Sequence, residues 1–136
     1  MVYTSAMVKD FAAWHSEKSR IDMPAEPQLL YKEREVWWMR VGFNVGAEQN
    51  GSHDTFSRPV VIVKGFSKTL FWGVPLSNTR NRSRYVVSVV IDGLERAANV
   101  SQLRALDTRR IGTKIGMISQ KDMSAIKNRL SELVLE

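Results

Sequence analysis

Short runs of β-branched and aromatic residues, separated by polar turns, fill the middle of this chain and restrict what it can fold into. Such runs have the composition of strands. They lie at residues 33–43, 59–66, 70–76, 85–91, 97–100 and 114–118. The three polar residues 67–69 predict a hairpin between the second and third runs, and Asp92 and Gly93 predict a turn after the fourth. The pattern predicts a mainly β domain of about five or six strands.

An amphipathic segment precedes these runs. Phe11, Trp14 and Ile21 recur at helical spacing, which predicts a helix over residues 7–21 with these three side chains on its inner face. A proline-containing connector follows at residues 22–32. We expect residues 1–32 to pack on the flank of the main domain, residues 33–136, and to cover apolar surface there as part of one globular unit.

A second helix is predicted at the end of the chain. Ser119 has the character of a helix cap, and Asp122 follows it as a first-turn acid. An apolar stripe at helical spacing then predicts the buried face. Its members are Met123, Ile126, Leu130, Leu133 and Val134.

The charge of the chain favours a polyanionic partner. Lys and Arg number 20 against 14 Asp and Glu, so 20 − 14 gives a net charge of +6. Residues 1–32 hold four of each sign, so the whole excess falls on residues 33–136. Arg makes up 12 of the 20 cations, and its planar forked donors suit phosphate and stack on bases. Charge alone is also consistent with a protein that is merely kept soluble.

Several function classes are excluded by what the sequence lacks. Without cysteine, the chain cannot be a disulfide scaffold, a thiol enzyme or a thiolate zinc protein. Its longest aliphatic runs, at residues 60–63 and 86–91, fall far short of the roughly 20 residues that span a bilayer. The first ten residues lack the features of a secretory signal. We expect a cytoplasmic protein with no membrane partner.

Metal or nucleotide chemistry has no support in the sequence either. His15 and His53 are the only histidines, and they lie too far apart to form an HExxH-type ligand pair. No Walker-type GK[ST], dinucleotide-binding glycine pattern or GxSxG elbow occurs. We expect no metal and no cofactor. We interpret His15 as a structural surface residue and His53, in a polar loop, as a candidate substrate contact.

A phosphate-directed set of residues remains. Its members are Glu48, Arg58, Ser77, Asn78, Arg80, Arg82, Arg84, Gln102 and Arg104. Cleaving RNA without a metal needs a positioned 2′-hydroxyl, a base for its proton, and fixed donors for the charge on the phosphorane oxygens. Glu, Arg and a hydroxyl can supply that set. Purely structural roles stay open as alternatives, namely a surface ion pair for Arg58, a backbone hydrogen bond for Ser77 and loop solubility for Glu48.

Five blocks of the sequence, taken in order, resemble the PemK/MazF-type toxins of bacterial type II toxin-antitoxin systems. The blocks are EREVWWMRVGFNVGAEQN, SRPVVIVK, FWGVPLSN, SQLRALDTRRI and KIGMIS. The correspondence runs from about Glu33 to Leu130 and omits mainly the N-terminal helix and its connector. The pairing of G-x-E-Q with a downstream R-P and a later S-Q-L-R is far more specific than any one block.

The resemblance implies an α+β fold: an SH3-like β-barrel of about five to seven strands with a C-terminal helix, here with an extra N-terminal helix. It implies a homodimer that a cognate antitoxin neutralises, in a complex that binds DNA. It also implies an endoribonuclease that cuts single-stranded mRNA at short sequences without metal, leaving a 2′,3′-cyclic phosphate and a 5′-hydroxyl.

Residue by residue, the resemblance places the family's activity-associated Arg and Glu on Arg58 and Glu48, and its usual Thr on Ser77. Since Arg has a pKa above about 12, we assign Arg58 to charge stabilisation rather than to proton donation, and Glu48 becomes the candidate base. Candidate substrate contacts are Gln49, His53, Asn78, Arg80, Arg82, Gln102 and Arg104. For Arg104, an ion pair with Asp107 at helical spacing is the alternative.

Two rival functions stay open. The same barrel could act without catalysis on a topoisomerase, although that related family acts through a C-terminal tryptophan and this chain ends Leu133, Val134, Leu135, Glu136. It could also be a degenerate module that binds RNA or antitoxin, which the Ser in place of Thr permits.

Overall fold

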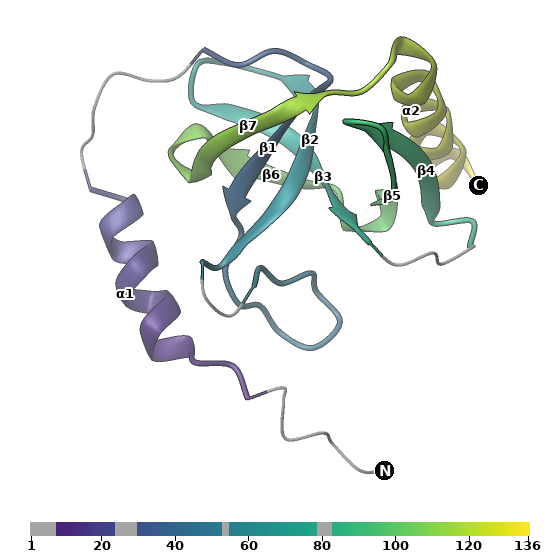
Figure 1. Cartoon of the computed structure of the whole chain (residues 1–136). Helices are drawn as coiled ribbons and strands as arrows, with labels where there is room; N and C mark the ends of the chain where they lie inside the picture. Colours follow the sequence, from purple (N-terminus) through teal and green to yellow (C-terminus); the bar gives the residue numbers. More distant parts are fainter. Residues whose placement is uncertain (1–7, 24–29, 53–54, 79–82) are drawn as a thin grey trace, which may run out of the picture.

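The structure is a computed structural model that describes residues 8–23, 30–52, 55–78 and 83–136 (Figure 1). In these ranges the strands are β1 (Glu35–Arg40), β2 (Ser57–Gly65), β3 (Leu70–Ser77), β4 (Val86–Ile91), β5 (Leu94–Asn99), β6 (Arg104–Asp107) and β7 (Ile111–Met117). The helices are α1 (Phe11–Ile21), the 3-10 turns η2 (Val100–Gln102) and η3 (Thr108–Arg110), and α2 (Gln120–Leu135).

All strand pairs are antiparallel and form one sheet in the order β4-β5-β3-β2-β1-β7, with β6 added beside β3. The two ends of this path approach each other, because a Cβ built on Gly116 of β7 would stand 3.0 Å from Ile91 Cδ1 of β4. Within the described residues β4 and β7 form no backbone pairing, so the curved sheet is not closed into a complete barrel. The predicted fold class, mainly β with a helix at each end, is confirmed.

Strand β2 is buried on both faces. Val61 and Val63 belong to a hydrophobic cluster that α2 covers, whereas Val60 and Ile62 belong to a second cluster among β1, β3 and β6. A strand buried on both sides reads as an unbroken apolar run, which is what the sequence has at this point. A slip of one residue would exchange the two faces, so the register of β2 is strongly fixed.

Strand β3 changes partner along its length. Residues 70–73 pair with β6, whereas residues 76 and 77 pair with β5. Strands β5 and β6 therefore pair with different parts of β3, and Ser77 lies in the part that pairs with β5. The predicted hairpin between β2 and β3 is confirmed, with the turn after Gly65 and before Leu70.

Helix α2 packs against β4 and begins as predicted. The Ser119 side chain accepts the Asp122 backbone N–H, and Met123 and Ile126 are buried. The prediction for Val134 is wrong, because this side chain is 81% exposed. It lies in the last turn of the helix, which extends beyond the core cluster (Figure 1).

Helix α1 lies on the opposite side of the molecule, beside the segment that joins β1 and β2 (Figure 1). Its first residue is Phe11 rather than residue 7, which lies outside the described residues, because the Asp10 side chain caps the helix by accepting the Ala13 N–H. Trp14 is buried and Ile21 partly buried, as predicted. Phe11 is not on a buried face; it is half exposed and touches Phe43 only edge to face.

The alternative for residues 104–107, an ion pair between Arg104 and Asp107 at helical spacing, is wrong. They form β6, whose Arg104 pairs with Gly73 of β3, so helical spacing does not apply. Asp107 instead binds Arg109, with 3.0 Å between Oδ1 and Nε. The strand predicted at 97–100 is β5, which starts earlier, directly after the turn at Asp92 and Gly93. Both turn residues have positive φ, as a tight hairpin of this type requires.

Candidate active site

The hairpin register brings Arg58 and Ser77 together. Val60 pairs with Pro75 across β2 and β3. Arg58 and Ser77 each lie two residues beyond this pair, and both line the same pocket. A hydrogen bond supports this, because Arg58 Nη1 donates to the Leu76 carbonyl at 3.2 Å.

Two backbone carbonyls hold the guanidinium of Arg58. Nε donates to the Asn50 carbonyl at 2.5 Å, and Nη1 donates to Leu76. Arg58 is half-buried, and this burial lowers the pKa of its guanidinium from the ordinary value, although an arginine stays charged at any physiological pH. Within the described residues no carboxylate lies within ion-pair distance of it. The cation is therefore oriented but not neutralised.

A polar pocket of about 420 Å³ opens at this point. That size suits a nucleotide. Its lining consists of Gln49, Arg58, Ser77, Ser83, Tyr85, Val86, Asn99, Ser101 and Gln102. Hydroxyls and amides predominate, and Arg58 is the charged member of this lining. The pocket can therefore accept an anion next to neutral hydrogen-bonding groups.

The segment between β1 and β2, residues 41–56, forms the wall that carries Gln49 and Asn50. We call it the β1–β2 loop. Asn44 organises its interior: its backbone N–H donates to Asn50 Oδ1 at 2.6 Å, and its side chain donates to the Gln49 carbonyl at 2.7 Å. These bonds fix the direction of the Asn50 carbonyl that holds Arg58.

Gln49 was predicted as a substrate contact, and its side-chain amide lies between Arg58 and Asn99. One amide atom is 2.7 Å from Asn99 Nδ2. With its oxygen turned toward the guanidinium, Gln49 accepts from Arg58 Nη2 at 3.1 Å. This orientation gives the guanidinium a third oxygen partner and leaves the arginine aimed into the pocket.

Both the oxygen and the nitrogen of the Gln102 side-chain amide form hydrogen bonds with the β1–β2 loop. Its oxygen accepts the Gln49 backbone N–H at 3.1 Å, and its nitrogen donates to the Ala47 carbonyl at 3.2 Å. The side chain also lines the pocket. In the structure Gln102 thus supports the loop, a role that sequence reasoning did not assign to it.

Glu48 and Arg104 lie close enough to interact electrostatically, beside the pocket rather than in its lining. The Glu48 carboxylate accepts the Val45 N–H at 2.9 Å. Burial lowers the pKa of Arg104, and the charge of Glu48 opposes that shift. Arg104 borders a small adjoining cavity that Gln49 also lines. The two predicted residues therefore flank the site from the loop and from β6.

The remaining candidates are placed less fully. Asn78 is exposed directly after β3 and outside the pocket lining. His53, Arg80 and Arg82 lie outside the described residues.

Sequence reasoning missed Tyr85, Asn99, Ser83 and Ser101. Tyr85 is 44% exposed, and its ring faces the Arg84 guanidinium at 5.5 Å. The only signal was indirect: Tyr85 begins the fourth strand-like run, directly after the arginine-rich segment. Asn99 and Ser101 reach the site only because β5 pairs with the last two residues of β3.

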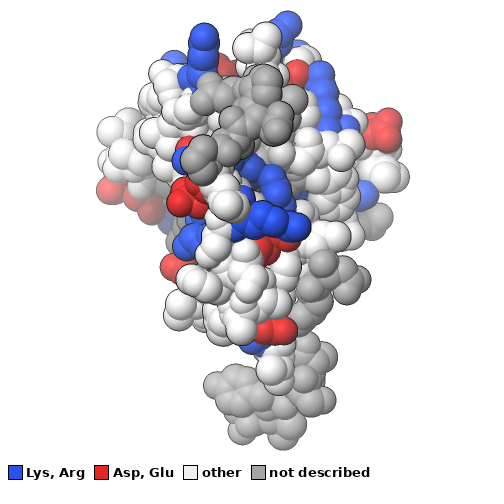
Figure 2. Space-filling model, turned by 90° about the vertical axis from the view of Figure 1, so that its left-hand side faces the viewer, with Lys and Arg blue, Asp and Glu red and all other residues white. Residues whose placement is uncertain are grey.

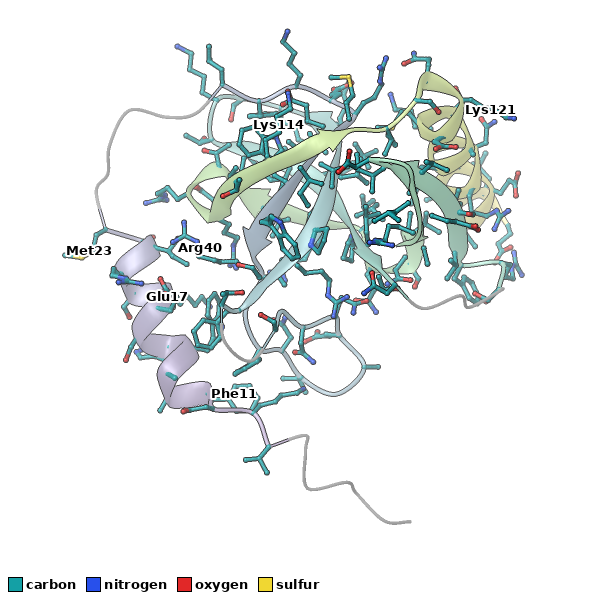
Figure 3. The ribbon with its side chains drawn as sticks, viewed as in Figure 1. Phe11, Glu17, Met23, Arg40, Lys114 and Lys121 are labelled. Atoms are coloured by element: carbon teal, nitrogen blue, oxygen red, sulfur yellow. The ribbon has the colours of Figure 1, made fainter. Side chains whose placement is uncertain are left out.

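Cations on the α1 side of the molecule lie beside acids. Figure 2 shows Lys and Arg gathered in the middle of this face with Asp and Glu close by. Arg40 Nη1 lies 3.7 Å from Glu17 (Figure 3), and Arg109 pairs with Asp107 at 3.0 Å and with Asp22 at 3.5 Å. These two arginines are therefore paired, unlike Arg58.

The described part of the chain contains no group of three or more His, Cys, Asp or Glu side chains placed to hold a metal ion. None of its helices is long and apolar enough to cross a membrane.

A family model matches most of the chain. The model of the PemK-like, MazF-like toxin of type II toxin-antitoxin systems matches residues 32–134, which include every described member of the site. The chain belongs to this toxin family. The resemblance noted in the sequence is thereby confirmed. No curated protein matches the toxin.

Solved structures share the toxin's fold. MazF from Deinococcus radiodurans is 17% identical with a TM-score of 0.64, over 79% of this chain and 99% of its own. An endoribonuclease in complex with its cognate antitoxin from a mycobacterial species is 16% identical with a TM-score of 0.61, over 77% and 95%. A MazE–MazF complex from Deinococcus radiodurans is 12% identical with a TM-score of 0.59, over 78% and 96%. At such identities the likeness shows the fold.

The two bonds of Gln102 to the loop give a first prediction. Gln102→Ala should speed hydrogen exchange at the Gln49 amide by about fivefold, because that amide loses its acceptor and one hydrogen bond is worth about 1 kcal/mol. NMR-detected exchange measures it. Ser101→Ala, at the exposed neighbouring position on the same turn, is the control and should leave the Gln49 amide unchanged. Equal exchange in both variants would contradict the supporting role.

Proposed function

We propose that this toxin is a metal-independent endoribonuclease that cuts single-stranded mRNA at short sequences. The single observation that carries the proposal is the half-buried Arg58 guanidinium, which is held by two backbone carbonyls and open to a polar pocket that Ser77 shares. A fixed, unneutralised cation of this kind is what a phosphate needs as its charge grows.

In the proposed reaction the ribose 2′-hydroxyl attacks the adjacent phosphorus, and the bond from phosphorus to the 5′-oxygen breaks. The departing 5′-oxygen takes up a proton from water, so the products are a 2′,3′-cyclic phosphate and a 5′-hydroxyl. Arg58 stabilises the charge on the phosphorane oxygens, and the Ser77 hydroxyl donates a further hydrogen bond to them. Glu48 is the proposed base, and its carboxylate would exchange the Val45 N–H for the 2′-hydroxyl.

The proposed substrate contacts extend from this centre along the chain. Gln49 and Asn78 flank the pocket, and Arg104 supplies a half-buried positive charge beside it. Gln102 contributes pocket lining while it holds the loop. His53, Arg80 and Arg82 complete the proposed set from the sequence.

We also propose that the toxin acts in the cytoplasm as a homodimer that a cognate antitoxin neutralises, in a complex that binds DNA. The main domain, residues 33–136, would form the toxin unit, with residues 1–32 appended. Exposed apolar side chains support the homodimer. The ring centres of Phe66 and Trp72 are 4.9 Å apart, next to the half-exposed Leu70. An acidic antitoxin segment would occupy the site through Arg58.

Topoisomerase poisoning and a degenerate binding module are the alternatives. The first acts in the related family without cutting RNA. The second predicts RNA binding without cleavage. Both predict intact RNA after incubation with the purified toxin.

Arg58→Ala tests the cleavage proposal. The variant should cut single-stranded RNA about 100- to 1000-fold more slowly than the wild type, which is the usual loss when one donor to the transition-state charge is removed. The assay is single-turnover cleavage in excess EDTA, with the new 5′-hydroxyl and cyclic phosphate identified by mass spectrometry.

The control for Arg58 is Arg96→Ala, which removes one arginine from β5, where Arg96 donates to the Glu95 carbonyl. It should cleave as the wild type does, and circular dichroism checks that both variants are folded. RNA left intact by the wild type, but shifted on a gel, would support the degenerate module instead. Cleavage that stops in EDTA would contradict a metal-free reaction.

Ser77 gives a matched pair of variants. Ser77→Ala should lose about 10- to 100-fold in cleavage rate, because a hydrogen bond to a charged group is worth roughly 1.5 to 3 kcal/mol. Ser77→Thr keeps the hydroxyl and adds a methyl that restricts χ1, so it should cleave at least as fast as the wild type. The same single-turnover assay measures both. An alanine variant as active as the threonine variant would remove Ser77 from the mechanism.

Tyr85 is predicted to stack on a base of the bound RNA, because its half-exposed ring lines the pocket beside Arg58. Tyr85→Leu should weaken binding about tenfold, within the usual range of about 1 to 3 kcal/mol per stacked base, whereas Tyr85→Phe should bind normally. Fluorescence anisotropy with RNA blocked by 2′-O-methyl groups measures this without cleavage. Trp38, 45% exposed and outside the pocket lining, provides the control Trp38→Leu. An equal loss there would rule out a specific stack.

A further inference from the structure

Helix α1 lies outside the family match, yet it packs on the loop that forms the site. Trp14 is its buried residue, only 6% exposed. The ring lies so close to Gly42 that a Cβ built on this glycine would stand 1.9 Å from it. It also meets the Phe56 ring at 5.4 Å. Because Gly42 opens the β1–β2 loop and Phe56 closes it, Trp14 touches both ends of the loop.

These two ends are joined by short backbone bonds. The Gly42 N–H donates to the Phe56 carbonyl at 3.0 Å, and the Gly51 N–H donates to the Gly42 carbonyl at 2.8 Å. Phe56 has a φ of +57°, which a residue with a Cβ rarely adopts. Such a conformation persists only where surrounding packing holds it, and the Trp14 ring supplies part of that packing.

A second contact from the start of α1 reaches the interior of the loop. Lys9 Nζ donates to the Asn44 carbonyl at 2.6 Å. Asn44 in turn donates from its backbone to Asn50 Oδ1, and the Asn50 carbonyl accepts from Arg58 Nε. A continuous set of contacts therefore leads from α1 through the loop to the guanidinium.

Trp14 and α1 also have neighbours outside the loop. The Arg110 guanidinium lies 6.0 Å from its ring centre, and Glu17 of the same helix lies near Arg40 (Figure 3). The helix is thus in contact with η3 and β1 as well as with the loop. This double attachment lets it resist movement of the loop relative to the sheet.

We propose that α1 clamps the β1–β2 loop, with Trp14 and Lys9 as positioning residues for Arg58. The clamp keeps the Asn50 carbonyl where it holds the guanidinium toward the pocket. Its effect on catalysis rests on the proposed ribonuclease function, whereas its effect on the loop does not depend on it.

The loop is tested without RNA, by NMR-detected hydrogen exchange on the full-length chain. Lys9→Met removes the bond to Asn44 at nearly constant size, and Trp14→Phe keeps an aromatic ring but loses the contact of the larger indole. Both should speed exchange of the Gly51 amide at least fivefold, and Trp14→Ala should do so more strongly. The Ile62 amide, in the core strand β2, should be unchanged in the two milder variants.

The control is Lys18→Met, which removes an exposed lysine from the same helix. It should leave exchange at Gly51 unchanged. Equal acceleration at Gly51 and Ile62 in Lys9→Met and Trp14→Phe would mean a general loss of stability and would overturn the clamp. Unchanged exchange at Gly51 in both variants would overturn it too.

Activity then separates positioning from stability. In multiple-turnover cleavage, Lys9→Met and Trp14→Phe should lower kcat about five- to tenfold and change KM less than twofold, because Arg58 would be misplaced for the charge that forms in the transition state. Trp14→Phe should retain more activity than Trp14→Ala. Loosened loops with unchanged kcat would overturn the link to Arg58. A wild type that cleaves nothing would overturn the ribonuclease proposal alone, since the exchange result still decides the clamp.

Discussion

The site depends on how the Arg58 guanidinium is held. Backbone carbonyls of Asn50 and Leu76 orient it, and carbonyls carry no net charge, so the positive charge stays available to a ligand. A carboxylate in the same place would have oriented the group equally well and neutralised it. One of these carbonyls comes from β3 and the other from the β1–β2 loop. The hairpin register and the loop conformation therefore act on the same side chain from two directions.

The half of the site that comes from the hairpin was predictable from sequence. The apolar run of β2, the short turn at residues 67–69 and period-two side-chain alternation together fix which residues of β2 and β3 oppose each other. The loop half was not predictable. It depends on Asn44 bonding to Asn50 and on a left-handed Phe56, and both arise from tertiary packing that no local pattern encodes. The supporting role of Gln102 was missed for the same reason.

The predictions that failed rested on helical spacing. Residues 104–107 carry charges at helical spacing, but β3 offers an unpaired edge that makes them a strand, so tertiary pairing overrides the local pattern. Phe11 and Val134 fit the periodicity of their helices yet lie where each helix extends beyond the surface it covers. Periodicity predicts the direction of a side chain on its helix and says nothing about whether a partner surface reaches that far.

Net charge suggested a polyanionic partner, but pairing decides where such a partner can bind. Arg40 and Arg109 contribute to the positive excess, yet each lies beside an acid on the α1 side, and the negative charge of that acid opposes the approach of a phosphate. Arg58 meets no such competitor in the described residues. The pocket also lacks carboxylates and imidazoles in its described lining, so proton transfer there needs a group from outside it. The lining of this pocket supplies an oriented positive charge rather than acid–base groups. A helix that holds the loop in place therefore acts on the orientation of that charge.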